Sequence, residues 1–363
     1  MSQRTYRAAI VGTGGIAGAH AKAVQASGGR VELVAVADVD TGRAAEFAAK
    51  FGGPNTYASA EELLREERLD FVHLCTPPQL HAPLALACLE AGVTALVEKP
   101  PTLSLAEFDT LIEAERRTGS HVATVLQHRF GAGAVRLRRL TEAGALGRPL
   151  LATCLTQWYR DEAYYAVPWR GTWESEGGGP TMGHGIHQFD LLLSVLGPWR
   201  EVTAVAARQY HAVDTEDVSM ALVTFESGAV ATVVNSVVSP RQTSELRFDY
   251  ERATVEVEHL YGYTDDDWTV TPAPGQEDVK SLWAADPGSG SSGHGGWLKA
   301  VVEALDAGQA PPVTVTDTRR TMDFIAALYA SAFTGERVRA GQITADSPFA
   351  RRMDGTGAPW RKK

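Results

Sequence analysis

The sequence predicts an α/β protein in which a doubly wound parallel sheet is followed by an α+β domain with an open, mostly antiparallel sheet. Three observations predict this class. The chain has 363 residues, too many for one ordinary core. Apolar runs alternate with helical patterns up to about residue 125, and longer alternating segments rich in Val and Thr come afterwards. We therefore predict two domains, residues 1–127 and residues 128–363.

The first domain shows short apolar runs separated by helical patterns, which is typical of parallel strands joined by crossover helices. The predicted strands are Tyr6–Val11, Val31–Ala37, Phe71–Cys75, Ala95–Val97 and His121–Leu126. The predicted helices are Thr41–Phe51, Ala60–Arg65, Ala82–Ala91 and Leu105–Thr118.

The second domain begins with a helix-like stretch that runs to Gly144. Its predicted strands are Leu150–Tyr159, Glu201–Ala207, Val218–Glu226, Ala229–Val238, Glu245–Tyr250 and Ala253–Glu258, with Ser227 and Gly228 as a hairpin turn. Helices Pro180–Leu196 and Thr316–Phe333 are expected to cover one face of the sheet. The other face could pair with a second subunit in a homodimer or homotetramer. Residues 287–296 predict a mobile Gly/Ser loop.

Composition narrows the class of partner. A net charge of −10 and the lack of a basic stripe argue against nucleic acid and anionic membranes, which leaves a small molecule. Neither a signal region nor a long apolar run is visible, so we expect a cytoplasmic protein. Three cysteines without Cys-x-x-Cys spacing predict neither disulfides nor a zinc site.

A glycine-rich turn follows the first predicted strand. Gly12, Gly14 and Ala17 form a G-x-G-x-x-A pattern at the start of a helix, the pattern of a Rossmann dinucleotide site. Gly12 permits the tight turn, and Gly14 lets the backbone approach a pyrophosphate at the helix N-terminus. Gly15 and Ile16, in the same turn, are also expected to contact the dinucleotide. The alternative is a glycine turn without a ligand.

Asp38 ends the second predicted strand, where a carboxylate can accept hydrogen bonds from the ribose hydroxyls and repel a 2′-phosphate. This favours NAD over NADP, although Arg43 could reach the same place. Thr76 and Pro77 end the third strand and are expected to line the nicotinamide side, or else to form only a structural turn. His81 is a further cofactor candidate, or simply the first residue of a helix.

Three further segments carry a resemblance to a known family: LCTPPQLHAP at 74–83, LVEKPPTLS at 96–104 and GGGPTMGHGIHQFDLLLSVLG at 177–197. With the glycine turn, they resemble the glucose-fructose oxidoreductase/inositol dehydrogenase family, also written Gfo/Idh/MocA, over nearly the whole chain. The resemblance implies an NAD(P)-dependent oxidoreductase that transfers hydride between a sugar or polyol alcohol and the nicotinamide.

The resemblance also implies the catalytic residues. Glu98-Lys99-Pro100 resembles the motif of the family's catalytic lysine, with a cis bond before the proline and Glu98 and Lys99 beside the cofactor. Burial and the positive nicotinamide ring would disfavour the ammonium form, so Lys99 can accept a proton. His187 resembles the family's catalytic-site histidine, and Asp190 the carboxylate that binds substrate or orients this histidine.

This chain departs from the family at Gly183, where many members have an aspartate four residues before the histidine. His184 could replace its hydrogen bonds, or the substrate could lack the matching hydroxyl. A metal held by His184, His187 and Asp190 is a weaker alternative, because the spacing includes no Glu or Cys partner, and we expect no metal.

Further candidates for substrate binding lie between a strand and this helix. Trp158 and Trp169 could stack on sugar C–H faces, or pack in a subunit contact. Arg170 could bind hydroxyls or a carboxylate, and Arg129 resembles a family position near the cleft. Two other functions stay open. One is a non-catalytic NAD(P)-binding regulator, and the other is a glycoside hydrolase that retains NAD.

Overall fold

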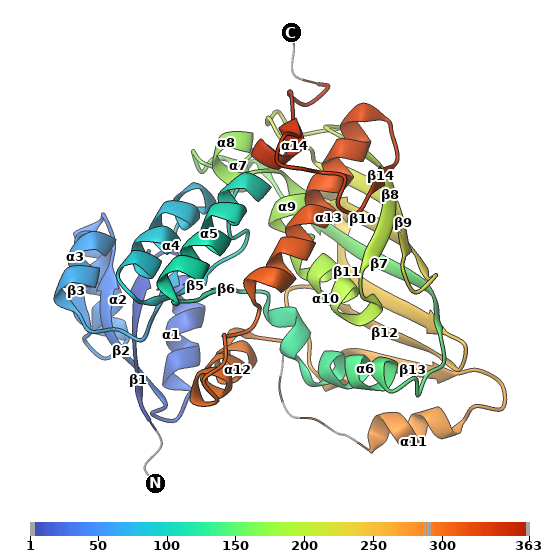
Figure 1. Cartoon of the computed structure of the whole chain (residues 1–363), viewed down its shortest axis with the longest axis horizontal. Coiled ribbons are helices and arrows are strands. Elements are labelled where there is room, and N and C mark those ends of the chain that lie inside the picture. Colours follow the sequence, from blue (N-terminus) through green and yellow to red (C-terminus); the bar gives the residue numbers. More distant parts are fainter. Residues whose placement is uncertain (1–3, 286–287, 289, 291, 361–363) are drawn as a thin grey trace. The chain divides into compact units, whose positions relative to one another are not determined.

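The computed structural model describes residues 4–285, 288, 290 and 292–360. The chain divides into two compact units (Figure 1). The first contains residues 1–102, 107–125 and 294–318, and the second contains residues 103–106, 126–293 and 319–363. The predicted division at residue 127 differs from these units in one main respect. Segment 294–318 belongs with the N-terminal part, although it is far away in the sequence.

A six-stranded parallel sheet forms the centre of the first unit, in the order β3-β2-β1-β4-β5-β6. This doubly wound order confirms the predicted class. The strands are β1 (Tyr6–Val11), β2 (Val31–Ala37), β3 (Asn55–Tyr57), β4 (Phe71–Leu74), β5 (Thr94–Val97) and β6 (Val122–Thr124). Strand β3 was not predicted, because it is a three-residue edge strand with two exposed polar residues and no apolar run.

Helices connect these strands close to the predicted positions. They are α1 (Ala17–Gln25), α2 (Thr41–Lys50), α3 (Ala60–Glu66), α4 (His81–Glu90) and α5 (Leu105–Thr118), with a short 3₁₀ turn at Pro78–Leu80. Helix α12 (His294–Asp306) also belongs to this unit, but it connects none of these strands and was not predicted. Asp40 caps α2 by accepting from Arg43 N at 3.0 Å, and Ser59 caps α3 by accepting from Glu62 N at 3.1 Å. These caps explain why both helices begin where the sequence places them.

The second unit contains an eight-stranded sheet in the order β13-β12-β11-β7-β10-β9-β8-β14. All neighbours are antiparallel except β10 and β7, which confirms a mostly antiparallel sheet. The strands are β7 (Pro149–Tyr159), β8 (Trp199–Ala207), β9 (Val218–Phe225), β10 (Val230–Ser236), β11 (Val238–Tyr250), β12 (Ala253–His259), β13 (Trp268–Pro272) and β14 (Val338–Arg339). The outermost strands β13 and β14 were not predicted, since short edge strands carry little periodic signal.

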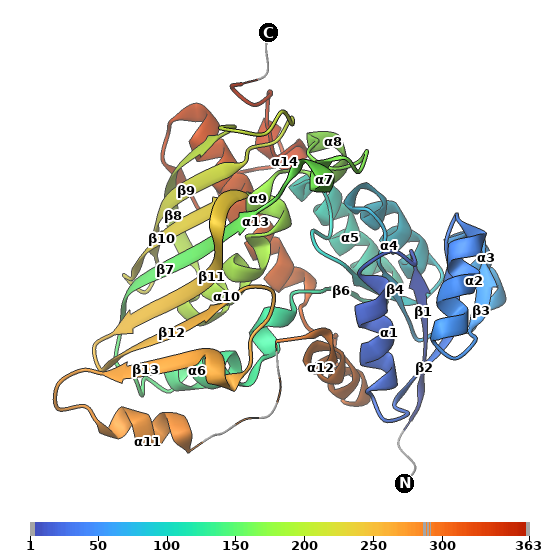
Figure 2. The same ribbon diagram turned by 180° about the vertical axis from the view of Figure 1, so that it is seen from behind.

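Helices cover one face of this sheet. Helix α10 and residues 319–334 of α13 lie in front of the sheet in Figure 1 and behind it in Figure 2, so both views place them on the same side. The opposite face exposes apolar side chains at alternating strand positions, among them Val205 (61% exposed), Met220 (50%) and Leu222 (64%). The helices and 3₁₀ turns associated with this unit are η2 (Gln127–Phe130), α6 (Ala132–Glu142), α7 (Glu162–Tyr165), α8 (Trp173–Glu176), α9 (Pro180–Gly183), α10 (Ile186–Leu196), η3 (Asp265–Asp267), α11 (Asp278–Ala284), α13 (Val315–Thr334) and α14 (Pro348–Arg351).

The predicted helix Pro180–Leu196 is wrong in one respect, because the chain forms two helices, α9 and α10, separated at His184 and Gly185. Gly185 packs against Asn235 so closely that a Cβ there would stand 2.3 Å from Asn235 Oδ1. This position between the two helices therefore has no room for a side chain. Helix α10 is also buried on nearly all sides, and His187 and Asp190 are among its buried residues.

The predicted Gly/Ser loop at 287–296 is described only in part. Residues 287, 289 and 291 lie outside the described residues, and the last three residues, from His294, begin helix α12. No helix within the described part of the chain is long and apolar enough to cross a bilayer.

Candidate active site

The glycine turn joins β1 to α1. Gly12 has a φ of +85°, and a Cβ there would stand 2.9 Å from backbone atoms of Cys75 and Thr76, so only glycine fits. At Gly14 and Gly15 a Cβ would meet nothing within 4 Å. Ile16 lies at the N-cap of α1 and is 39% exposed. The turn therefore leaves open space before a helix N-terminus, which fits a pyrophosphate.

Asp38 lies directly after β2 and ties the end of this strand to the glycine turn. It accepts hydrogen bonds from Thr13 N (2.8 Å) and Thr13 Oγ1 (2.9 Å), and it forms an ion pair with Arg43. Burial opposes ionisation, but hydrogen bonds from Arg43, Thr13 and the Asp40 amide lower the pKa of Asp38 to about 2. The side chain is therefore a carboxylate at neutral pH, and its contact with the ribose stays a prediction.

His81 links the two loops that follow β4 and β5. Its Nδ1 is 2.7 Å from the carbonyl oxygen of Pro100, and its Nε2 is 2.8 Å from that of Thr76. The ring is 1% exposed. Thr76 and Pro77 are partly buried. His81 thus holds the loop of Thr76 and Pro77 against the loop that contains Lys99, and its direct contact with the coenzyme stays a prediction.

Lys99 follows the buried end of β5. The Lys99–Pro100 bond is cis, as the resemblance implied. The backbone N–H of Lys99 donates to Glu98 Oε2 at 3.1 Å, and Lys99 is partly buried. The other carboxylate oxygen of Glu98 contacts two histidines, His20 and His294. These contacts were not predicted, and the expected contact of Glu98 with the coenzyme stays a prediction.

In the second unit, Arg129 and Asp190 form a buried ion pair. Arg129 Nε donates to Asp190 Oδ2 at 2.7 Å, and Arg129 Nη2 donates to Oδ1. The side chains are 10% and 0% exposed. Thr321 Oγ1 lies 3.5 Å from the same carboxylate. Asp190 therefore ties α10 to the η2 turn, a structural connection that the sequence did not predict for either residue.

His187 lies in the first turn of α10 and is 7% exposed. Its ring stacks on His128, the residue before Arg129, with the ring centroids 4.6 Å apart and the planes at 22°. His259 and Tyr263 surround His128 at ring distances of 5.2 and 6.0 Å. Burial lowers the pKa of His259 to about 4, so its imidazole is neutral at pH 7. His187 thus stands in a cluster of aromatic rings.

The predicted substrate residues of this unit fall into neighbouring contacts. His184 meets Trp158 edge to face at 5.0 Å and lies 6.1 Å from the Tyr164 ring. Arg160 lies over Trp158 and Tyr164. A separate set of contacts places Arg170 over Tyr164 and Trp169, at 3.9 and 4.4 Å from the ring centroids. Tyr164 therefore connects His184 and Trp158 with Trp169 and Arg170.

Gly183 and Gly185 provide a matched pair for mutation. A Cβ at Gly183 meets nothing within 4 Å, whereas one at Gly185 would collide with Asn235. We expect Gly183→Ala to leave stability unchanged or raise it by up to about 1 kcal/mol. Gly185→Ala should lower it by about 1–3 kcal/mol, since the core cannot accommodate the added group. Urea unfolding of both variants checks this. Equal losses of unfolding free energy in the two variants would contradict the difference in packing between Gly183 and Gly185.

Sequence reasoning missed His128 as a member of these clusters. His128 directly precedes the Arg129-Phe130 pair that resembles the family, and this adjacency was the available signal. Tyr164 and Arg160 lie in the aromatic-rich stretch at 157–173, but composition alone does not indicate which rings meet. The His20 and His294 contacts with Glu98 had no sequence signal, because the three residues belong to distant segments.

The doubly wound sheet, the glycine turn and the carboxylate after β2 define a dinucleotide-binding protein of the Rossmann class. Two family models match the chain. Residues 6–125 match the oxidoreductase family with an NAD-binding Rossmann fold, and residues 134–274 match the GFO/IDH/MocA C-terminal domain. The chain therefore belongs to the Gfo/Idh/MocA family of oxidoreductases and has an NAD-binding domain, which confirms the predicted family and coenzyme.

Individual relatives match nearly the full chain. D-glucoside 3-dehydrogenase of Escherichia coli is 26% identical over 93% of this chain and 98% of its own length. D-apiose dehydrogenase of Paraburkholderia graminis is 27% identical, with 95% and 92% covered. The WlbA dehydrogenase of Chromobacterium violaceum, solved with NADH and UDP-GlcNAcA, superimposes with a TM-score of 0.83 at 26% identity, covering 95% of this chain and 98% of that chain.

Proposed function

We propose that the enzyme oxidises a secondary alcohol of a sugar, polyol or sugar derivative, with NAD as the hydride acceptor. The proposal rests mainly on the arrangement of three loops in the first unit. The glycine turn, the Thr76–Pro77 loop and Lys99 follow β1, β4 and β5, which are neighbours in the sheet. Because parallel strands end at one edge, Lys99 belongs to the edge where the coenzyme binds. The relatives named as glucoside and apiose dehydrogenases support the substrate class.

In the proposed reaction, Lys99 Nζ takes the proton of the substrate hydroxyl as hydride leaves the adjacent carbon. His187 polarises the same oxygen. Asp190 acts as a positioning residue, since its ion pair with Arg129 fixes the turn that holds His128 against the His187 ring. A crystal structure with bound NAD and substrate would test these roles of Lys99 and His187.

The coenzyme preference follows from Asp38. Its carboxylate is ionised and repels a 2′-phosphate, and Arg43 is already engaged by it. This supports NAD over NADP. Bound NAD would supply the acceptor carbon for hydride, and the glycine turn and Asp38 would hold its pyrophosphate and ribose.

The aromatic rings around His184 support a sugar-like substrate, because the C–H face of a sugar ring can stack on an aromatic side chain. Trp158 and Tyr164 present aromatic surface beside His184, and Arg160 and Arg170 add cations that can donate to hydroxyl or carboxylate oxygens. Gly183 leaves room where many family members have an aspartate. We propose that the substrate lacks the hydroxyl that this aspartate would bind, or that His184 binds that hydroxyl in place of the aspartate.

The main experiment measures the formation of NADH and NADPH with a panel of inositols, aldoses, anhydrosugars and sugar acids. NADH formation with one class of these alcohols supports the proposal. No turnover across the panel, together with NAD binding, would favour a regulator. Tightly retained NAD, with glycoside cleavage and no net NADH, would favour the hydrolase.

We also propose that the enzyme is a homodimer or homotetramer assembled through the exposed face of the eight-stranded sheet. Leu222, at 64% exposed, lies among other outward apolar residues on this face. Leu222→Glu should therefore weaken assembly, because it places a charge in the contact. Light scattering after size exclusion measures the mass. Leu282→Glu in α11 is the matched control, since Leu282 is also exposed (37%) but lies outside the sheet.

An unchanged mass for the Leu222→Glu variant would contradict the proposed interface.

We also propose the cytoplasmic location that the sequence predicts. The buried, unbonded state of Cys75, Cys88 and Cys154 is in keeping with a reducing compartment.

A further inference from the structure

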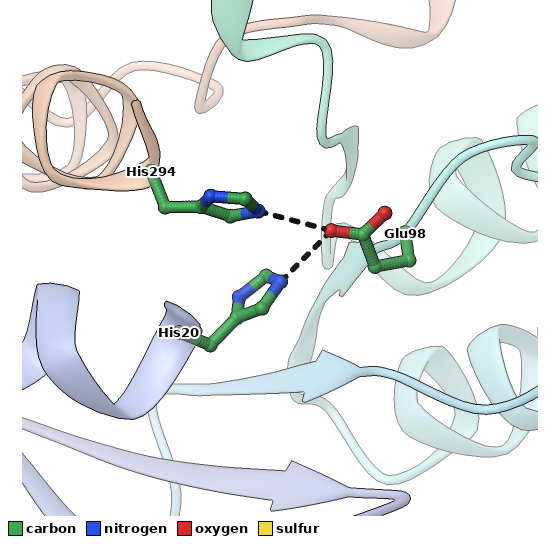
Figure 3. Close-up of side chains that lie close together, drawn as sticks. All are labelled: His20, Glu98 and His294. Carbon is green, nitrogen blue, oxygen red and sulfur yellow. Dashed lines mark hydrogen bonds and ion pairs between the residues drawn. The ribbon is translucent and has the colours of Figure 1, made fainter. Parts of the chain in front are cut away.

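We propose that His20, Glu98 and His294 of the first unit bind a divalent transition-metal ion, and that zinc is the ion that fits them best. The three side chains converge in Figure 3, where both imidazole rings point toward one carboxylate oxygen. Their ligand atoms all lie within 4.8 Å of one another. This inference does not depend on the proposed substrate or on the roles of Lys99 and His187.

Two of the three distances between the ligand atoms are close to those of a tetrahedral set. His20 Nε2 lies 2.9 Å from Glu98 Oε1, and His294 Nε2 lies 3.2 Å from the same oxygen. Zinc binds imidazole nitrogen and carboxylate oxygen at about 2.0–2.2 Å, so ligand atoms at tetrahedral angles stand about 3.3 Å apart. Each nitrogen is therefore already near this spacing from Glu98 Oε1, and all three ligand atoms lie within 4.8 Å of one another.

The three residues come from separate parts of the first unit. His20 lies in α1, Glu98 follows β5, and His294 is the first residue of α12. Their side chains are 1%, 7% and 14% exposed. The three ligand side chains are therefore held by secondary structure and shielded from most of the solvent. This distinguishes the group from a cluster of exposed acidic side chains, which are mobile and bind ions weakly.

His73 supplies the outer support that ligand histidines usually have. Its Nδ1 lies 2.9 Å from His20 Nδ1, on the side of the ring opposite the proposed ion. A metal-bound His20 carries its proton on Nδ1, and this proton can then be donated to His73. Trp297, which is fully buried, lies beside both rings at centroid distances of 6.3 Å. These contacts fix the orientation of the His20 ring.

Two imidazoles and one carboxylate leave a fourth position for water or another small ligand. The ion would also join α12 to the strand end that precedes Lys99, because Glu98 Oε2 accepts from the Lys99 backbone N–H at 3.1 Å. The sequence alone predicted no metal, and residues 20, 98 and 294 are too far apart in the chain to form a spacing motif.

The test uses the full chain after treatment with a chelator. Calorimetric titration with Zn²⁺ should show one equivalent bound per chain, and Co²⁺ should produce the intense visible absorption of four-coordinate cobalt. His294→Gln should abolish both signals. His294 begins a helix and is partly accessible, so this variant is expected to fold, which circular dichroism checks.

His121→Gln is the matched control, because His121 also lies near a carboxylate of the first unit, 3.6 Å from Glu115, and belongs to no ligand group among the described residues. It should bind zinc like the unchanged protein. His73→Phe should weaken binding by about 10–100-fold, as expected for loss of an outer partner. Absence of stoichiometric binding by the unchanged chain, or undiminished binding by His294→Gln, would overturn the proposal.

Discussion

Replacing Lys99 with alanine is expected to lower turnover by about 10²–10⁴-fold, the usual contribution of a positioned general base. The backbone after β5 should keep its course, since the N–H of residue 99 still donates to Glu98. NAD affinity should therefore change little. Absorbance of NADH at saturating substrate gives the turnover, and calorimetry gives the NAD affinity.

Lys50→Ala is the matched control for this experiment, since Lys50 is exposed at the end of α2. It should keep both turnover and NAD affinity. Near-normal turnover of the Lys99→Ala enzyme would remove Lys99 from the proposed mechanism. A loss of NAD binding equal to the loss of turnover would assign Lys99 to the coenzyme site instead.

Asp190→Asn is expected to lower the free energy of unfolding by about 3–5 kcal/mol, because it leaves the Arg129 guanidinium buried without its counter-charge. Asparagine has nearly the size of aspartate, so the loss reflects charge and hydrogen bonding and not a cavity. Denaturant unfolding measures the change, with fluorescence and circular dichroism followed together to verify a single transition.

Two further variants distinguish the expected loss of stability in Asp190→Asn from the loss caused by breaking an exposed ion pair. Glu251→Gln breaks the Arg148–Glu251 pair, whose side chains are 73% and 42% exposed, and should cost less than about 1 kcal/mol. The double variant Arg129→Met/Asp190→Leu removes both buried charges and should recover much of the stability. A loss for Asp190→Asn as small as that for Glu251→Gln would show that the buried pair is not required.

The glycine turn and the strand ends of the Rossmann fold were predictable because they depend on local constraints. The turn at Gly12 needs a glycine, and a strand followed by a helix places Asp38 and Thr76 at one edge of the sheet. These constraints act over a few residues, so they leave a readable pattern. The short strand β3 was missed, since pairing with β2 along one edge is enough to form it without an apolar pattern of its own.

The pairings within the site were not predictable to the same extent. Arg129 and Asp190 are separated by 61 residues, and nothing in either segment indicates that one charge neutralises the other. The need for glycine at residue 185, between α9 and α10, likewise depends on Asn235, which lies in β10. Such contacts depend on the way distant segments pack.

The sequence by itself determined the class of fold, the dinucleotide turn, the family and the strand end that carries Lys99, because each depends on periodicity or on a short motif. Tertiary structure alone decided that Asp190 pairs with Arg129, that His187 stacks on His128, and that His20 and His294 meet at Glu98. The physical reason is that an ion pair, a ring contact or a set of metal ligands needs only proximity in space, and residues far apart in the chain acquire it when the core is packed.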